Sequence, residues 1–377
     1  MRHGHKVYSV STYEKRLMLP TELAEGESYT ALHVRTGNMT GCGMIEKGLS
    51  TLMIGSQYRR ALHRYLSDVP FDLIIYSTPP ITLAGVVSHI KKKTCATTYL
   101  LLKDIFPQNA VDIGVMRTKG LKGLLYRYFR KKEKQLYRIS DRIGCMSDAN
   151  REYLLQNEPW IPAEKVEISP NCMEVREISA SAEERLNIRE KYGIPADKKV
   201  FVYGGNLGKP QDIPFIINCL RAVAEMKDAF FLIVGKGSEY EKLRNYLDTA
   251  HQQNAKLIPQ LPKDEYDTML AACDVGLIFL DHRFTIPNFP SRLLTYMQAR
   301  LPVIACTDTH TDVGSVMTQG GFGWWCESNS PDAFAALVKD ALKADLTLMG
   351  NNAHRYLCEH YSAEQQYENI MRSIGQL

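Results

Sequence analysis

The stretch KVFVYGGNLGKPQDIPFIINCLRAVAEMKDAFFLIVGKG (residues 199–237) decides the fold class, because it has the pattern of a strand, a turn, a helix and a second strand. Its two ends, KVFVYGGNLG and AFFLIVGKG, are apolar runs of the kind found in strands that are buried on both faces. The segment Pro214–Met226 between them predicts a helix. A strand–helix–strand unit of this kind predicts a parallel, doubly wound α/β sheet.

The same alternation extends on both sides of this stretch. Toward the C-terminus, helices are predicted at Glu239–Ala250 and Lys263–Ala272, among the apolar runs AKLIPQL, DVGLIFL and LPVIACTD. Toward the N-terminus, HKVYSVSTY, FDLIIYSTP, ATTYLLLKD and DRIGCMSD predict strands. The segments GSQYRRALHRYLSD, LAGVVSHIKKK and KGLLYRYFRKKEKQLYRI predict the helices between those strands. The pattern therefore predicts two parallel sheets with helices packed on them.

A break in the alternation predicts the domain boundary. The pattern weakens around residues 170–182, where SASAEER predicts a helix start capped by Ser179 or Ser181. We therefore predict one domain over residues 1–175 and a second over residues 176–360.

Composition favours a folded protein without a membrane span. Of the 377 residues, 45% are apolar and 23% are charged, which is typical of globular chains. The longest apolar candidate, Phe71–Val87, is interrupted by an aspartate, a serine and a Pro-Pro pair. Nine cysteines without C-x-x-C spacing indicate reduced thiols rather than a disulfide framework or a zinc site. We therefore expect a cytoplasmic protein.

One segment carries a large local excess of positive charge. Residues 117–142 contain ten Lys/Arg and two Asp/Glu, a formal charge of +8 in a chain whose net charge is +4. Leu, Tyr and Phe alternate with these cations, as in basic amphipathic helices that lie on anionic lipid. A solvated helix with an apolar stripe is the alternative interpretation. Nucleic acid is not expected as a partner, since no nucleic-acid-binding signature accompanies the charge.

Two turns are candidates for phosphate binding: the first is rich in glycine, and the second contains proline and arginine. In VYGGNLGK (residues 202–209), backbone amides can approach a phosphate and Lys209 would add a charge. In PNFPSRLLTYM (residues 287–297), Ser291 can cap a helix and Arg292 can bind two phosphate oxygens at once. An anion at that helix start would also explain why the first turn contains no acidic residue. An ordinary turn and a capped helix with a surface arginine remain the alternatives.

Lys103 and Asp104 are the candidate catalytic residues. They end the apolar run in LLLKDIFPQ, and the carboxyl ends of parallel strands are where such folds bind ligands. Asp104 is placed to orient or deprotonate a hydroxyl. A helix-capping aspartate is the alternative.

Taken in order, five segments resemble glycosyltransferase family 4, the retaining transferases of the GT-B fold. These segments are YLLLKDIFPQNAVDIG, VYGGNLGKPQ, FFLIVGKGSEYEKL, LPKDEYDTMLAACDVGLIFLDHRFTIPNFPSRLLTYM and LPVIACTDTHTDVG. The resemblance covers nearly the whole chain and looks closest to bacterial enzymes that build O-antigen, capsule or exopolysaccharide units. It implies an α/β fold of two Rossmann-like, doubly wound domains that face a cleft. The last helix, within residues 361–377, would return to the first domain.

The resemblance implies that the second domain binds the donor. Its first turn and the PSRLL helix start would hold the diphosphate, and the LIPQLPKDEY segment would hold the base. The implied donor-binding residues are Gly204, Gly205, Asn206, Lys209, Gln260, Leu261, Pro262, Asp281, Arg283, Asn288, Pro290, Ser291, Arg292, Leu293 and Thr295.

The sequence departs from the family pattern at the donor sugar. Many members carry two glutamates eight positions apart, one touching the sugar and the other the ribose. The corresponding residues here are Pro287 and Thr295. A threonine can still meet a ribose hydroxyl, whereas Pro287 offers no side-chain polar group. The sugar contact would then come from Asp281, His282, Arg283 or Asn288.

A second departure lies at the front of the chain. Family chains usually begin with a strand, a Gly-rich loop and a helix, whereas here the segment His3–Val7 follows Met1 almost at once. We therefore expect this chain to lack the first strand and loop of its first domain.

The function implied by the resemblance is metal-independent transfer, with retention, of a hexosyl or N-acetylhexosaminyl group. The donor would be a UDP-sugar and the acceptor a lipid-linked saccharide of a bacterial surface polysaccharide. No cofactor is expected, and residues 117–142 would hold the protein peripherally at the inner face of the cell membrane. Two alternatives stay open: a GT-B UDP-N-acetylglucosamine 2-epimerase, and a transferase-like protein without catalytic activity.

Overall fold

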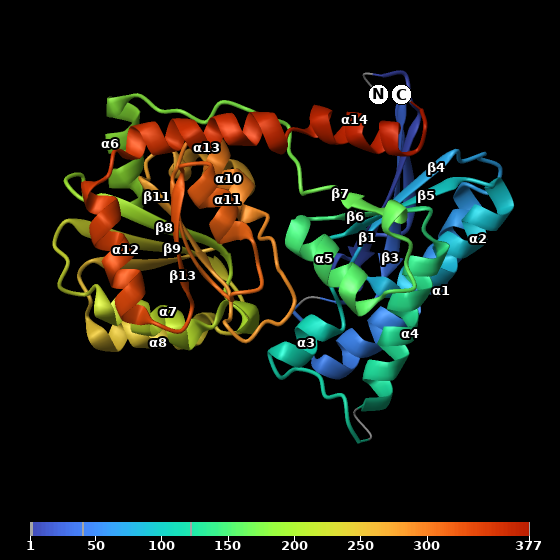
Figure 1. Ribbon diagram of the computed structural model, residues 1–377, viewed down its shortest axis with the longest axis horizontal. Coiled ribbons are helices and arrows are strands. Elements are labelled where there is room, and N and C mark those ends of the chain that lie inside the picture. The colour runs from blue at the N-terminus through green and yellow to red at the C-terminus, as the bar shows by residue number, and fades with distance from the viewer. Residues whose placement is uncertain (1–2, 40, 121–122, 377) are drawn as a thin grey trace. The chain divides into compact units, whose positions relative to one another are not determined.

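Figure 1 shows the computed structural model, which describes residues 3–39, 41–120 and 123–376. The chain divides into two units that interleave along the sequence. The first unit comprises Met1–Pro107, Met116–Gly144 and Glu164–Val166. The second unit comprises Gln108–Val115, Cys145–Ala163 and Glu167–Leu377. The domain boundary expected after residue 175 stays a prediction.

The first 170 residues contain seven short strands and five helices within their described part. The strands are β1 (Val7–Glu14), β2 (Glu22–Glu25), β3 (Tyr29–Thr36), β4 (Leu73–Ser77), β5 (Thr97–Leu102), β6 (Arg142–Cys145) and β7 (Val166–Ile168). The helices are α1 (Met44–Tyr65), α2 (Ala84–Thr94), α3 (Gln108–Asp112), α4 (Gly123–Ile139) and α5 (Asp148–Asn157). Short 3-10 helices are η1 (Lys15–Leu17), η2 (Ile81–Leu83) and η3 (Ala163–Lys165).

These strands form two sheets. β1 and β3 pair in parallel with β2 antiparallel at the edge, in the order β1-β3-β2, and the other sheet has the order β4-β5-β6-β7. The predicted strands correspond to β1, β4, β5 and β6, whereas β2, β3 and β7 have no counterpart in the sequence-based prediction. The four residues of β2, ELAE, lack the apolar alternation that marks a strand, because this edge strand is mostly exposed.

Helix α1 is longer than the pattern predicts. We expected a helix from Gly55, but α1 begins at Met44. Its first half exposes apolar side chains such as Leu49 and Met53, so it lacks the clean amphipathic pattern used to recognise helices. Ile54, at the middle of α1, and apolar residues of its second half are buried against β3 and α2.

The remainder of the chain, from residue 182, forms the main body of the second unit. Its strands are β8 (Lys199–Asn206), β9 (Ala229–Lys236), β10 (Ala255–Pro259), β11 (Val275–Phe279), β12 (Val303–Thr307) and β13 (Gly323–Glu327). Its helices are α6 (Ala182–Tyr192), α7 (Ile213–Ala222), α8 (Tyr240–Ala250), α9 (Lys263–Leu270), α10 (Arg292–Gln298), α11 (Val313–Gln319), α12 (Pro331–Lys343), α13 (Leu346–His360) and α14 (Ala363–Ser373). The 3-10 helix η4 (Lys209–Gln211) lies between β8 and α7.

The six strands of this unit form one parallel sheet in the order β10-β9-β8-β11-β12-β13. Helices α7, α8 and α12 cover one face of the sheet, and α9, α10, α11 and α13 cover the other (Figure 1). The strand order reverses between β8 and β11, and the carboxyl ends of strands at such a reversal form the ligand crevice of α/β sheets. The α/β class with two Rossmann-like domains is confirmed.

Local capping explains where several helices begin and end. Ser181, and not Ser179, caps α6, and Glu184 completes the capping box. Helix α7 ends at Ala222 rather than at Met226, because the side chain of Asn254 donates hydrogen bonds to the carbonyls of Val223 and Met226. Residues 223–226 therefore form a loop that the Asn254 side chain holds in place of another helical turn.

Helix α14 closes the described part of the chain. It is capped by Ser362, and Gln366 donates a hydrogen bond to Ser169, which directly follows β7. The expected return of this helix to the first domain stays a prediction; Leu377, like Met1, lies outside the described residues. Within the described ranges, no helix combines the length and the apolar content that crossing a bilayer requires.

The Asp274 carboxylate provides a test of this fold. It accepts hydrogen bonds from Arg185, Arg189 and the Val200 amide, and thereby ties α6 to β8 and β11. Arg189 and Asp274 are nearly buried. Asp274→Ala leaves the buried guanidinium of Arg189 bonded to backbone carbonyls but without a counter-charge, so we expect a loss of about 3–5 kcal/mol in the free energy of unfolding, measured by urea denaturation.

A matched control is the exposed pair of Lys191 and Glu265, whose side chains lie 3.7 Å apart. Glu265→Ala should change the same free energy by less than about 1 kcal/mol. Equal effects of the two substitutions would contradict the role given to Asp274.

Candidate functional site

Three loops meet at the carboxyl edge of the second unit's sheet, at the strand-order reversal. The amide of Asp281, just after β11, donates a 2.9 Å hydrogen bond to the carbonyl of Pro210 in η4. The amide of Gly204 near the end of β8 donates to the hydroxyl of Tyr296 in α10, at 3.1 Å. The turn after β8, the turn after β11 and the start of α10 therefore form one continuous surface.

Two glycines permit this close approach. A Cβ at Gly204 would lie 1.8 Å from the hydroxyl of Tyr266, well inside contact distance. Gly205 has a φ of +138°, and a Cβ there would lie 3.0 Å from Nη2 of Arg292. These positions therefore require glycine: one for the tyrosine behind the strand and one for both its backbone angle and the guanidinium beside it.

Arg292 is held at the centre of this surface. Its guanidinium lies 4.4 Å from the centroid of the Tyr203 ring, a cation–π contact. Its Nη1 is buried and, among the described residues, has no hydrogen-bond partner. Burial lowers the pKa of Arg292, but the Tyr203 and Tyr296 hydroxyls outweigh that effect and raise it. The site thus presents a permanent positive charge with an unused donor.

Tyr296 and Tyr266, two tyrosines near Arg292, stay neutral. Burial is the main cause that raises the pKa of Tyr296 to about 12, and burial also raises the pKa of Tyr266. The Tyr296 hydroxyl donates to the carbonyl of Leu277 at 3.1 Å while it accepts the Gly204 amide. The sequence-based prediction missed these tyrosines, because nothing in their local sequence distinguishes them from ordinary core residues.

The turn after β8 is held by its own side chains. Nδ2 of Asn206 donates to Oε1 of Gln211 at 2.9 Å, and the amide of Gly208 donates to the same oxygen at 3.2 Å. Lys209 is exposed at the start of η4. Asn206 thus shapes the turn, and Lys209 is accessible to an anion.

Asp281 and Arg283 pair with one another. Asp281 is fully buried, and its carboxylate accepts hydrogen bonds from the backbone amide, Nε and Nη2 of Arg283. Burial raises the pKa of Asp281, but these hydrogen bonds and the charge of Arg283 outweigh it and place the pKa below its ordinary value. Asp281 is therefore an anion that is already neutralised.

One group of acidic and histidine side chains within the described residues has the spacing of a metal site. Ligand atoms of Asp212, Asp281 and His282 lie within 4.8 Å of one another. Burial and the nearby charge of Asp281 raise the pKa of Asp212. Because Arg283 already occupies the carboxylate of Asp281, these residues fit a metal ion poorly. The expectation of metal independence stays a prediction.

The segment predicted to hold a base follows β10. Gln260 is exposed, Leu261 packs against the core, and the carbonyl of Pro262 accepts the amide of Tyr266 at 2.9 Å. Through Tyr266 this segment is connected to Gly204. The structure thus brings the predicted base segment and the predicted diphosphate turn together.

The start of α10 differs in one respect from the expectation. Ser291 occupies the N-cap position, but its φ of −60° and ψ of −22° are helical and its side chain makes no capping bond. The turn begins one residue earlier, because the amide of Leu293 already bonds to the carbonyl of Pro290 at 3.1 Å. Leu293 is buried, and Thr295 is half-buried on α10.

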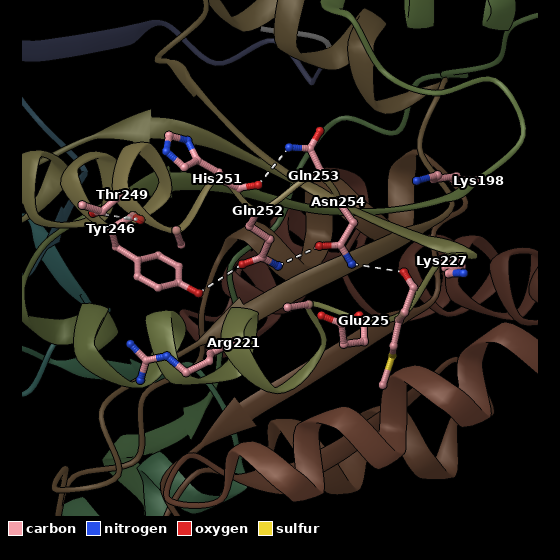
Figure 2. A pocket seen from close by; sticks show the side chains of 13 residues that line it. Lys198, Arg221, Glu225, Lys227, Tyr246, Thr249, His251, Gln252, Gln253 and Asn254 are labelled. Carbon is pink, nitrogen blue, oxygen red and sulfur yellow. Dashed lines mark hydrogen bonds between the residues drawn. The ribbon is translucent and has the colours of Figure 1, made fainter.

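A wide pocket lies at the other edge of this sheet (Figure 2). It has a volume of about 720 Å³ and is lined by residues that precede β8, β9 and β10. In Figure 2, Arg221 lies at one side of the pocket and Lys198 and Lys227 lie at the other, so these cations do not converge. The side chains of Gln252 and Asn254 bond to each other and to backbone carbonyls. This pocket is therefore not the predicted site.

The first unit holds the two candidate catalytic residues after β5. Asp104 is positioned by Thr78, whose hydroxyl donates to the Asp104 carbonyl at 3.0 Å and accepts the Asp104 amide at 3.2 Å. Burial raises the pKa of the Asp104 carboxyl to about 6. Lys103 is exposed. Asp104 is thus ionised at neutral pH but close to its pKa, as a general base requires.

The parallel sheet, the turn that carries Gly204 and Gly205, and the half-buried Arg292 place the chain among α/β proteins whose ligand crevice lies at the carboxyl edge of the sheet. A comparison with known protein families is more specific: residues 184–371 match the family Glycosyl transferases group 1. The main body of the second unit is therefore similar to the group 1 glycosyltransferases over these residues.

Curated bacterial relatives agree with this family. The chain is 27% identical over 308 residues to the probable glycosyltransferase WbjE of Pseudomonas aeruginosa. The aligned region covers 81% of this chain and 75% of the relative. It is 22% identical to the putative colanic acid biosynthesis glycosyl transferase WcaI of Escherichia coli, over 72% of this chain and 66% of the relative. Its homologues thus include glycosyltransferases of bacterial polysaccharide biosynthesis.

Solved structures show the same fold. The sucrose-phosphate synthase of Thermosynechococcus elongatus matches with a TM-score of 0.74 at 15% identity, over 100% of this chain and 90% of that one. Anabaena HepE in complex with UDP-glucose matches with a TM-score of 0.66 at 14% identity, over 92% of this chain and 86% of that one. The fold is that of GT-B glycosyltransferases.

The raised pKa of Asp104 predicts a pH-dependent stability difference. The folded state disfavours the charged carboxyl, so the contribution of this group to stability is present at low pH and is lost as the pH rises through about 6. Asp104→Asn removes this loss. We expect the variant to be more stable than the wild type by roughly 1–3 kcal/mol at pH 8 and about equal at pH 4, measured by urea denaturation.

Lys103→Gln is the control for this measurement, since it changes an exposed neighbour. Its difference from the wild type should not depend on pH. A constant difference for Asp104→Asn across pH 4–8 would show that the carboxyl is not buried as described.

Proposed function

We propose that this protein is a retaining glycosyltransferase of family 4 that uses a UDP-sugar donor. It moves a hexosyl or N-acetylhexosaminyl group onto a lipid-linked saccharide during synthesis of a bacterial surface polysaccharide such as O-antigen, capsule or exopolysaccharide. The observation that carries the proposal is Arg292: its guanidinium stacks on Tyr203 beside Gly205, and its buried Nη1 has no hydrogen-bond partner among the residues described.

The donor diphosphate supplies the partner that Arg292 lacks. A guanidinium can donate two parallel hydrogen bonds to phosphate oxygens, and such charge-assisted bonds are the strongest that side chains make. The amides of the glycine turn and the exposed Lys209 add further positive potential at the same edge. Together they stabilise the negative charge that develops on the leaving diphosphate, so the reaction proceeds without a metal.

Uracil is the proposed base, and Gln260 to Pro262 form its proposed binding segment. The matching structures of Anabaena HepE contain UDP, UDP with glucose, or UDP-glucose, which supports a UDP-sugar as donor. The connection of this segment to the glycine turn through Tyr266 is consistent with a base and a diphosphate bound side by side.

Asp104 is the proposed contact for the acceptor hydroxyl. A carboxylate with a pKa of about 6 is ionised at neutral pH and accepts a proton or a hydrogen bond from an attacking hydroxyl. Thr78 holds its backbone from both sides. Lys103, exposed beside it, would favour an anionic acceptor such as a lipid diphosphate.

Helix α4 is the proposed membrane contact. Its buried face includes Phe129, Leu136 and Tyr137, whereas Leu124 and Leu125 are exposed among lysines and arginines. An exposed face that combines apolar and basic side chains suits the surface of an anionic bilayer. Residues 121 and 122 of the basic stretch lie outside the described residues. The proposal places the protein peripherally at the inner face of the cell membrane.

Arg292→Ala tests the donor site. We expect it to weaken binding of UDP and of UDP-sugars by roughly 1.5–3 kcal/mol, the contribution of a hydrogen bond to a charged group, in calorimetric titration. Lys209→Ala should weaken the same affinities, by less because Lys209 is exposed. Arg292→Lys should restore part of the affinity, since lysine keeps the charge but cannot bind two oxygens at once.

Arg221→Ala is the matched control, because Arg221 lines the pocket at the other edge of the sheet. It should leave the affinity for UDP unchanged. If Arg292→Ala binds UDP as the wild type does while remaining folded, the phosphate role of Arg292 is wrong. Conversion of UDP-N-acetylglucosamine to its manno epimer by the protein alone would favour the epimerase instead.

Charge reversal on α4 tests the membrane contact. The wild type should sediment with liposomes that contain anionic lipid at low salt and dissociate at high salt, because the attraction is screened within about 10 Å at 0.1 M. Arg127→Glu combined with Lys131→Glu, two exposed positions on α4, should abolish this sedimentation.

The control places the same change of charge on α8, as Lys242→Glu combined with Arg244→Glu. If both double variants lose binding equally, net charge and not α4 is responsible. Equal sedimentation of the wild type with neutral liposomes would also contradict an electrostatic contact.

A further inference from the structure

Asp308 is a buried carboxylate that the site as described so far does not use. It directly follows β12, and its side chain is fully buried. Oδ1 accepts the amides of His310 at 2.8 Å and of Thr311 at 3.0 Å, which shapes the loop. Oδ2 is buried and has no hydrogen-bond partner among the described residues. One oxygen of this carboxylate is therefore structural, and the other is unsatisfied.

Asn288, on the neighbouring loop, has a buried donor that lacks an acceptor within the described chain, whereas Asp308 has a buried acceptor that lacks a donor there. Its Nδ2 is buried without an acceptor among the described side chains and backbone groups. Its carbonyl accepts the hydroxyl of Thr311 at 2.6 Å, and the Thr311 amide bonds to Asp308. Thr311 thus ties the two residues to one place, after the adjacent strands β11 and β12. Asn288 also lies four residues before Arg292.

Leaving such groups unsatisfied costs about 1–3 kcal/mol each, more for a charged group. A native site that keeps an unsatisfied acceptor and an unsatisfied donor together therefore points to a ligand that offers both. A phosphate is disfavoured by the negative charge of Asp308, and a cation would leave Nδ2 of Asn288 without an acceptor. A hydroxyl fits, because it donates one hydrogen bond and accepts up to two.

We propose that Asp308 and Asn288 bind hydroxyl groups of the sugar carried by the nucleotide donor and thereby select that sugar. This inference rests on the proposed function. It also accounts for Pro287, which offers no polar side chain, and for Asp281, whose carboxylate is already paired with Arg283. Asp308 accepts from a sugar hydroxyl through Oδ2, and Asn288 donates through Nδ2.

The test compares UDP with a UDP-sugar in the full-length protein. A panel of UDP-glucose, UDP-galactose and UDP-N-acetylglucosamine first identifies the sugar that wild type binds most tightly. Asp308→Asn keeps an oxygen for the amides of His310 and Thr311 but removes the charge. We expect it to weaken binding of that UDP-sugar by roughly tenfold or more and to leave binding of UDP within about twofold. Asn288→Ala should show the same selective loss.

Deoxy analogues of the same UDP-sugar identify the hydroxyl. For the analogue that lacks the bound hydroxyl, wild type and Asp308→Asn should bind equally, because the interaction is already absent. Asp345→Asn is the matched control: its carboxylate accepts a backbone amide at the start of α13, far along the chain. It should change neither affinity.

Three results would overturn the proposal in distinguishable ways. If Asp308→Asn and Asn288→Ala both keep the wild-type affinity for the UDP-sugar, these residues do not touch the sugar. If they weaken UDP as much as the UDP-sugar, or lower the melting temperature in proportion, their role is to shape the loop. If wild type binds neither UDP nor any UDP-sugar, the proposed function fails, and this assignment fails with it.

Discussion

The guanidinium of Arg292 lies 4.4 Å from the centre of the Tyr203 ring, and the rest of the second unit's site is arranged around this contact. Tyr203 belongs to β8 and Arg292 begins α10, so the stacking joins two segments that are nearly ninety positions apart in the chain. Gly205 must lack a side chain because the guanidinium lies beside it. The hydroxyl of Tyr296 then bonds to Gly204 and Leu277, which aligns α10 with both strands.

The charges at this edge divide into satisfied and unsatisfied groups. Arg283 neutralises Asp281, so that pair holds the loop and attracts neither anion nor cation strongly. Within the part of the chain that the structure describes, Arg292 and Asp308 each keep one buried polar atom without a hydrogen-bond partner. A positive group suits a phosphate, and a carboxylate beside an amide suits a hydroxyl. A sugar attached to a diphosphate contains both, which is why one ligand accounts for both observations.

Two carboxyl groups are kept in surroundings that oppose their ionisation. Burial raises the pKa of Asp104 in the first unit and of Asp308 in the second. Replacing either carboxyl with an uncharged side chain would stabilise the fold if packing alone mattered, because the substitution avoids the desolvation of the anion. Functional sites commonly retain such locally unfavourable groups, and natural proteins compensate for them elsewhere in the fold.

Apolar periodicity by itself determined the α/β class, the positions of most strands and the turns in which Gly204, Gly205 and Arg292 occur, because buried parallel strands form continuous apolar runs. It missed β2, β3, β7 and β13; β2 is mostly exposed and β7 is only three residues long, so neither forms such a run. Only the tertiary structure showed that Ser291 does not cap α10 with its side chain, that Asp281 is paired with Arg283, and that Tyr266 and Tyr296 surround the arginine. These features depend on contacts between loops that are distant in sequence, and hydrogen bonding between such loops leaves no periodic signal in the chain.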